Sequence, residues 1–175
     1  ETAYQAVKAG AHIINDVWGA KYDPDMPSVM AETNVPVILV HNRFDTNYQE
    51  FMPDVIADLN HSIAITVKAG VNPYNIILDP GVGFVKTFRQ NLEAIRRLNE
   101  IVDMGYPVLL GTSRKSMIGK ALDLPVEERV EGTGATVCLG IERGCSIVRV
   151  HDVKEISRMA KMMDIMLEKG AVSHG

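Results

Sequence analysis

The sequence has 175 residues, of which 46% are hydrophobic and 23% are charged, and its formal net charge is −4. This balance is typical of one globular domain and excludes a largely disordered chain. The weak negative charge gives no electrostatic footprint for nucleic acid or for an anionic membrane surface. No apolar run approaches the roughly 20 residues that a membrane span needs, so we expect neither a nucleic-acid nor a membrane partner.

The first residue, Glu1, leads at once into a helical pattern that ends near Gly10. The basic and apolar regions of a signal peptide are not seen before this helix. Cys138 and Cys145 do not have the spacing of a metal site or a redox motif. We therefore expect a cytoplasmic protein, and we expect the sequence to be a fragment whose first helix is already under way.

Five short apolar runs recur along the chain, each nearly continuous in Ile, Val and Leu. Continuous runs, unlike alternating ones, are typical of strands buried on both faces, as in a parallel sheet. The predicted strands are residues 11–17, 36–40, 75–78, 107–110 and 146–150.

Helical patterns separate these strands. From Thr87 to Val102, apolar residues in steps of three and four predict one helix, and a second such stripe runs from Val153 to Leu167. The other long helices are predicted at 51–68 and 127–140, the latter started by Pro125.

One helix followed by five strand–helix units predicts an α/β fold with right-handed parallel crossovers. An open doubly wound sheet and part of an eight-stranded barrel both fit this order. A glycine-rich nucleotide loop does not follow the first strand, and polar residues end all five strands, which in a barrel meet at one mouth. We predict a partial (β/α)8 TIM barrel with about five C-terminal βα units and the first three strands missing, so that residues 1–175 form one incomplete domain.

The strand ends carry groups that could bind a ligand. Asp79 follows an apolar strand and offers two acceptor oxygens to a flat edge with adjacent donors, such as a guanidinium or an amino-pyrimidinone ring. Asn15 suits the neighbouring edge of the same ring through its amide. A helix N-cap or salt bridge for Asp79, and an Asx-turn for Asn15, are the structural alternatives.

Cationic side chains gather at the last two strand ends. Arg114 and Lys115 lie where a helix begins, although Arg114 could equally form a surface salt bridge. Arg149 and His151 are two residues apart on a strand, so their side chains point to the same side and could clamp an anion. The residues alone therefore predict an anion site beside a planar heterocycle, which fits a pyrophosphate leaving group on an aromatic bicycle.

Four strings in this order resemble the dihydropteroate synthases: IINDVWG at 13–19, ILDPGVGF at 77–84, LGTSRKS at 110–116 and RVHD at 149–152. The resemblance covers essentially the whole chain. It implies a transferase of folate biosynthesis that condenses 6-hydroxymethyl-7,8-dihydropterin pyrophosphate with p-aminobenzoate to give 7,8-dihydropteroate and pyrophosphate. It also implies Mg²⁺ as cofactor, sensitivity of the family to sulfonamides, and a homodimer at full length.

The resemblance further implies a role for each matching residue. Asn15 and Asp79 would hold the pterin ring by its amino-pyrimidinone edge, and the catalytic candidates would be Lys115, Arg149 and His151. Arg149 and His151 would grip the pyrophosphate, while Lys115 would reach the pterin and, with Ser116, p-aminobenzoate. The residues that would line the pterin slot are Val17, Asn42, Phe84 and Gly111.

Part of the family's site has no counterpart in the sequence. A metal-contacting Asn, a ring-binding Asp and two loops would all precede Glu1, so we predict no metal ligand within these residues and little activity for the isolated fragment. Two alternatives stay open: a methyltransferase-like pterin-binding barrel, against which the cationic clamp argues, and an inactive pterin- or anion-binding fragment.

Overall fold

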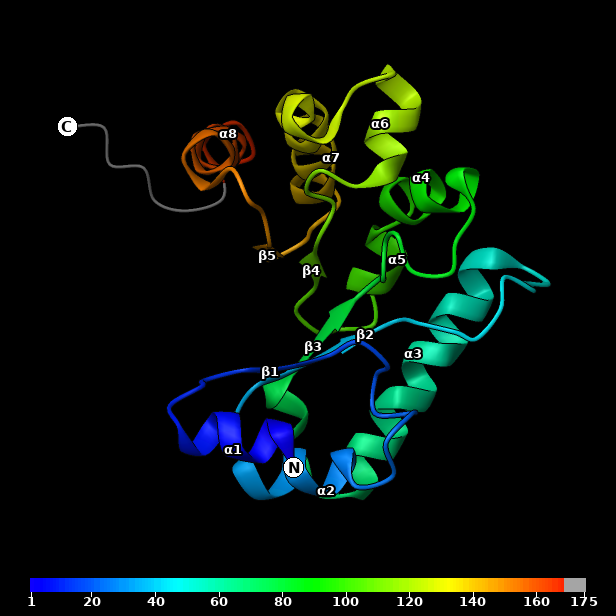
Figure 1. The fold of residues 1–175 in the computed structure, drawn as a ribbon, viewed down its shortest axis with the longest axis vertical. Coiled ribbons are helices and arrows are strands. Elements are labelled where there is room, and N and C mark those ends of the chain that lie inside the picture. Colours follow the sequence, from blue (N-terminus) through cyan, green and yellow to red (C-terminus); the bar gives the residue numbers. More distant parts are fainter. Residues whose placement is uncertain (169–175) are drawn as a thin grey trace.

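The computed structural model describes residues 1–168, which form an α/β fold of parallel strands separated by helices (Figure 1). The predicted domain of residues 1–175 therefore includes seven residues, 169–175, that lie outside the described part. The strands are β1 (Ile14–Asp16), β2 (Val37–Val40), β3 (Ile76–Asp79), β4 (Leu109–Leu110) and β5 (Ile147–Val148).

The strands lie side by side in chain order. β1, β2 and β3 form one parallel sheet, β4 and β5 form another, and a parallel bridge between Leu78 and Val108 joins them. A doubly wound sheet reverses its strand order at a switch point, and the described strands show no such reversal. The predicted parallel α/β class is thus confirmed.

Helices alternate with the strands and lie on the convex side of the sheet (Figure 1). None within residues 1–168 is both long and apolar enough to cross a membrane. The α-helices are α1 (Thr2–Lys8), α2 (Met26–Thr33), α3 (Phe51–Lys68), α4 (Phe88–Arg96), α5 (Asn99–Val102), α6 (Ser116–Leu122), α7 (Val130–Glu142) and α8 (Val153–Met166), and 3₁₀ turns occupy Pro73–Asn75 and Val126–Glu128.

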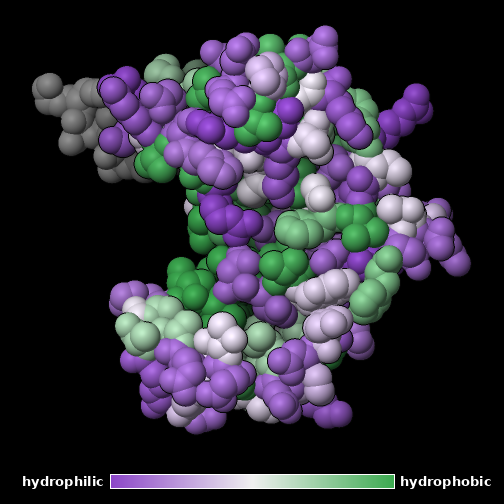
Figure 2. All heavy atoms as spheres, in the orientation of Figure 1, coloured by the Kyte–Doolittle hydropathy of each residue, from purple (hydrophilic) through white to green (hydrophobic). Residues whose placement is uncertain are grey.

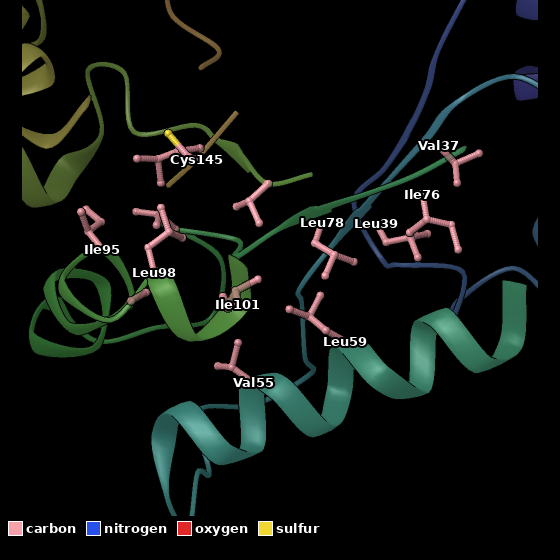
Figure 3. Close-up of a cluster of buried hydrophobic side chains, with 14 of the residues drawn as sticks. Val37, Leu39, Val55, Leu59, Ile76, Leu78, Ile95, Leu98, Ile101 and Cys145 are labelled. Atoms are coloured by element: carbon pink, nitrogen blue, oxygen red, sulfur yellow. The ribbon is translucent and has the colours of Figure 1, made fainter. Parts of the chain in front are cut away.

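The main core lies between the sheet and the helices. Alternate strand residues such as Leu39 and Leu78 are fully buried there, and Val55 and Leu59 of α3 point toward them (Figure 3). The intervening strand residues point to the concave side, where they form a smaller cluster. Its members are Ile38, Val40, Ile77 and Leu109, with Phe84 packed against them.

The sheet is strongly curved. Arg149 follows β5 and Asn15 lies on β1, at opposite ends of the strand order, yet Arg149 Nη1 is 2.7 Å from Asn15 Oδ1. In a flat sheet, four spacings of about 4.8 Å would separate these strands by about 19 Å. The strands therefore wrap around the hollow that Figure 2 shows between the parts built from α1–α3 and from α4–α8.

The helix predictions were right for α1, α3 and the bounds of α8, and wrong in detail for the two helices predicted at 87–102 and 127–140. The helix predicted from Thr87 to Val102 is divided, because the backbone leaves the helical region at Arg97 (φ −105°, ψ 22°). This break lets α5 turn Ile101 into the core. Likewise, the helix predicted at 127–140 is a 3₁₀ turn followed by α7, with non-helical Arg129 between them.

The predicted apolar stripe of the last helix is also wrong at its start. Val153 is 63% exposed, whereas Ile156 is fully buried. Val153 is the first residue of α8, and its side chain borders an open hollow beside β5.

Candidate active site

Asp79 is a nearly buried carboxylate at the end of β3, on the concave side of the sheet. Its Oδ1 accepts a hydrogen bond from the backbone N–H of Gly81 at 2.8 Å, and its Oδ2 lies 3.5 Å from Arg149 Nη2. Burial raises the pKa of Asp79, against the opposing effects of Gly81 N–H, Arg149 and Lys115. Oδ2 is thus held only by a long contact, which a better donor could replace.

Arg149 joins the two residues that were predicted to hold one ring edge. Its guanidinium donates to Asn15 Oδ1 at 2.7 Å and reaches Asp79 at 3.5 Å, while the side chain stays about half exposed. Gly111 makes this placement possible, because a Cβ there would lie 3.0 Å from Arg149 Nη2. The structure therefore brings Asn15, Asp79, Gly111 and Arg149 together.

A pocket of about 170 Å³ lies beside this group. It contains two cations, Lys115 and Arg149, and no carboxylate, so its charge suits an anion. His151 is fixed at its rim, because His151 Nδ1 lies 2.8 Å from the Oγ of buried Ser113 and the same Oγ accepts from His151 N at 3.0 Å. The lining residues are Gly111, Ser113, Lys115, Arg149, Val150 and His151.

Lys115 links this pocket to the loop after β3. Its Nζ donates to the carbonyl of Val82 and lies 5.0 Å from the centre of the Phe84 ring. Gly83, at φ +87°, leaves room for the lysine stem, since a Cβ there would be 3.0 Å from Lys115 Cδ. Burial lowers the pKa of Lys115, while the carboxylate of Asp79 raises it. An ammonium and an aromatic face thus border the same space.

Three predicted residues stand apart from this group. Asn42 is buried, and its Oδ1 accepts from Arg43 N at 3.0 Å. It lines a separate hollow of about 370 Å³ with Trp18 and Phe44. Val17 and Ser116 are exposed, and neither is among the residues that line the 170 Å³ pocket.

Arg114 forms a salt bridge, the structural alternative to a ligand-binding role. Its guanidinium binds both carboxylate oxygens of Asp152, at 3.0 and 2.5 Å. Its backbone adopts φ +56°, and Arg114 is not among the residues that line the pocket.

Lys86 and His41 were not among the predicted site residues. Lys86 Nζ lies 2.8 Å from His41 Nδ1 and donates to the carbonyls of Gly81 at 3.0 Å and Phe84 at 3.1 Å. Burial lowers the pKa of Lys86 to about 7. A single lysine after a glycine-rich turn has no periodic pattern, so no signal in the sequence could have identified it.

The described residues, 1–168, contain no group of three or more His, Cys, Asp or Glu side chains placed to hold a metal ion. The cations that surround the pocket also disfavour a metal cation held by protein groups alone. The residues present therefore do not make a metal site by themselves.

Comparison with known proteins matches residues 1–151 to the family described as pterin binding enzyme. Dihydropteroate synthase from Bacillus subtilis (strain 168) is 64% identical over 173 residues, which are 99% of this chain and 61% of that protein. The enzyme from Clostridium beijerinckii is 57% identical over 170 residues, 97% of this chain and 63% of that protein. The chain thus spans about three fifths of the length of these relatives.

Solved structures show the same likeness. Clostridium difficile dihydropteroate synthase, crystallised in the presence of pteroic acid, superposes with a TM-score of 0.93 at 48% identity, covering 95% of this chain and 64% of that one. The Yersinia pestis enzyme gives 0.91 at 33% identity, with 95% and 68% covered. The chain belongs to the pterin-binding enzyme family, and the relatives it matches there are dihydropteroate synthases.

Proposed function

We propose that this chain supplies the pterin slot and the pyrophosphate clamp of a dihydropteroate synthase. The observation that carries the proposal is the bridge that Arg149 makes between Asn15 and Asp79, beside a cationic pocket. The amino-pyrimidinone edge of a pterin is a cyclic guanidine, so it presents the same pattern of adjacent N–H donors as an arginine side chain. A site that holds its own guanidinium in this place has the acceptors that a pterin needs.

Binding of the substrate would then redistribute these contacts. The ring donors replace Arg149 at Asp79, and Asn15 holds the neighbouring edge. Arg149 moves the short distance into the adjoining pocket, where His151 and Lys115 also face the pyrophosphate. Phe84 borders the pterin ring, and Lys115 lies over the face of the Phe84 ring.

The proposed reaction forms a bond between the amine nitrogen of p-aminobenzoate and the exocyclic methylene of the dihydropterin. The bond from that methylene to the pyrophosphate oxygen breaks, and the amine nitrogen releases one proton to solvent or to the departing pyrophosphate. Negative charge grows on the departing oxygen. Preplaced cations stabilise such charge more in the transition state than in the ground state. This is the role we assign to the cations Lys115 and Arg149, with His151 as a hydrogen-bonding partner of the pyrophosphate, and it requires no covalent enzyme intermediate.

We also propose that the described residues, 1–168, form the later five βα units of a (β/α)8 barrel. The consecutive strand order, the strong curvature and the helices on the convex side support this architecture. A closed barrel of this kind needs eight strands. The relatives, of which the chain spans about three fifths, have enough additional length for three more.

The remaining family properties are proposals of the same kind. Because the described residues do not form a metal site, we propose that Mg²⁺ is held by the pyrophosphate and by groups outside them. A homodimer is supported by apolar side chains exposed on α8, namely Met162, Ile165 and Met166. Cytoplasmic location and sulfonamide binding are proposed from the family alone.

The test is a chimera in which residues 1–175 replace the matching segment of the Bacillus subtilis relative, assayed for pyrophosphate release. We expect release that requires p-aminobenzoate and that disappears with Lys115→Ala, while Lys120→Ala, at an exposed position on α6, keeps it. A well-folded chimera without p-aminobenzoate-dependent release would overturn the proposal and favour a methyl-transferring or non-catalytic pterin-binding protein. For the 175-residue chain by itself we expect little or no turnover.

A further inference from the structure

Side chains donate to several carbonyl groups of the loop after β3, residues 80–86, and Asn91 Oδ1 and Asp79 Oδ1 accept from N–H groups of the same loop. Lys115 donates to Val82 and Tyr48 Oη donates to Val85 at 3.1 Å. Lys86 itself donates to Gly81 and Phe84 from inside the loop. This loop supplies the N–H that fixes Asp79 and the Phe84 ring that borders the proposed slot. Its conformation therefore sets the geometry of the ligand-facing groups.

Lys86 donates to two of these carbonyls, and it also connects to a partly buried, hydrogen-bonded chain of polar groups. The third contact of its Nζ is His41 Nδ1 at 2.8 Å, and His41 Nε2 lies 3.0 Å from Asp58 Oδ2. His41 is 1% exposed. Asp58 is fixed in turn by Arg43 Nε at 2.5 Å. The order Lys86–His41–Asp58 thus runs from the loop to α3 beneath the site.

These contacts need a definite number of hydrogens. Lys86 makes three contacts and His41 makes one more with Asp58, so four hydrogens must be shared along the chain. An ammonium brings three and a neutral imidazole brings one, which satisfies all four contacts. Removing one proton leaves a contact without a hydrogen, and adding one sets two N–H groups against each other. All four contacts of the hydrogen-bonded chain Lys86–His41–Asp58 are therefore satisfied in one protonation state only, with Lys86 charged and His41 neutral.

Charged groups from several parts of the fold affect the pKa of Lys86. Burial lowers its pKa, Asp79 of β3 and Asp58 of α3 raise it, and Lys115 and Lys21 lower it, with about 7 as the result. Burial also lowers the pKa of His41 to about 4, although its hydrogen bond with Asp58 raises it.

Asp58 stays ionised at the far end of the chain. Burial favours a higher pKa for its carboxyl, but hydrogen bonds from His41 and Arg43 and the charge of Lys21 outweigh this effect and leave the pKa below its usual range. The protonation state that satisfies all four contacts is therefore lost at acid pH, when His41 gains a proton, and near neutral pH, when Lys86 loses one.

We propose that Lys86, hydrogen-bonded through His41 to Asp58, is a positioning residue. It holds the 80–86 loop in the conformation required for pterin binding. The inference rests on the proposed function and adds a residue that does not touch the ligand. It predicts that affinity for a pterin is greatest between about pH 4 and about pH 7. Affinity falls above this range, where Lys86 loses a proton, and below it, where His41 gains one.

The experiment measures binding of the fluorescent pterin 6-hydroxymethylpterin to the 175-residue chain from pH 3 to pH 9. For Lys86→Met we expect binding about tenfold weaker near pH 6 and no decline of its own above pH 7, because one charged hydrogen-bond donor is worth about that factor. His41→Gln keeps an acceptor toward Lys86 and a donor toward Asp58 without titrating. It should keep the alkaline decline and lose the acid one.

Lys120→Met is the matched control, because Lys120 is exposed on α6 and should leave the profile unchanged. The ligand's own titration is common to all variants and cancels in the ratio to the unaltered chain. A ¹³C titration of the Lys86 side chain, assigned by its loss in Lys86→Met, gives a second measure of the alkaline limb.

The outcomes separate the two proposals. If the unaltered chain and Lys86→Met bind the pterin equally at every pH, the positioning role is overturned and the pterin slot stands. A uniform loss of affinity with an unchanged pH profile would also overturn it, since it would show only a structural role for Lys86. If the unaltered chain does not bind the pterin, the proposed function fails, and this inference fails with it.

Discussion

Arg149 Nη2 lies 3.5 Å from Asp79 Oδ2 across the concave face of the sheet, while Nη1 of the same guanidinium binds Asn15 at 2.7 Å. One arginine thus occupies both acceptors that we assign to the pterin ring. Its cationic group also belongs to the adjoining pocket that we assign to pyrophosphate. The two subsites therefore compete for Arg149 until a pterin displaces it.

This arrangement predicts positive coupling between the two ligands. Pyrophosphate should bind about tenfold more tightly once 6-hydroxymethylpterin is present, within the usual range of coupling between sites. Titration calorimetry with and without the pterin measures this ratio. In Arg149→Lys the coupling should vanish, because an ammonium cannot span Asn15 and Asp79 together. Arg143→Lys, at an exposed arginine paired with Glu142, should preserve it.

The burial of Asp79 predicts that the free energy of unfolding depends on pH. Burial raises the pKa of Asp79, so its contribution to stability is present below the ordinary value of 3.8 and is lost as pH rises through the folded pKa. The free energy of unfolding of the unaltered chain, relative to Asp79→Asn, should therefore fall between pH 4 and neutrality. Urea unfolding at several pH values tests this, and a constant difference would contradict it. The same variant should bind the pterin at least about tenfold less tightly, as it loses a charged acceptor.

Gly81 is predicted to be indispensable to the fold of the site. Its φ is +66°, and a Cβ there would lie 1.9 Å from the carbonyl oxygen of His41. Gly81→Ala should cost more than about 3 kcal/mol, because neither backbone can give way. Gly10→Ala is the matched control, since its φ is +107° with no atom within 4 Å of the added carbon. That variant should cost only the conformational strain, about 1 kcal/mol; equal costs in urea unfolding would refute the steric explanation.

The two faces of β3 should respond differently to truncation. Leu78 is fully buried against the helices, and Leu78→Ala should cost about 2–5 kcal/mol. Ile77 belongs to the smaller cluster beside the hollow, so fewer buried apolar side chains would surround the void left by its truncation. Ile77→Ala should cost less than about half as much. Chemical denaturation of both variants tests this, and a larger loss at Ile77 would show that the concave face is the main core.

Much of the fold could be predicted because the runs of Ile, Val and Leu mark strands buried on both faces. The pattern located all five strands and gave α3 its bounds. It failed where a helix changes direction: periodicity continues through Arg97, although the backbone there does not. Local spacing records which residues are apolar, and it does not record how a helix must bend to bury both Ile95 and Ile101.

The candidate site divides in the same way. The residue types at the strand ends predicted an anion site beside a ring, and the structure groups Asn15, Asp79 and Arg149 accordingly. Asn42 was predicted for the same slot and stays a prediction there, and the structure shows its amide oxygen accepting from the backbone N–H of Arg43. Hydrogen bonds with near neighbours decide such orientations, and a motif does not contain them.

By itself, the sequence determined the α/β class, the places of the five strands along the chain and the family to which the chain belongs, since these depend on residue type and on spacing along the chain. Only the tertiary structure decided that Arg149 reaches a strand 134 positions earlier, and that Lys86 lies against His41, 45 positions away. Both contacts follow from the curvature of the sheet and the path of a buried loop. These depend on the packing of all the elements together, because no single segment fixes the distance between groups so far apart in the chain.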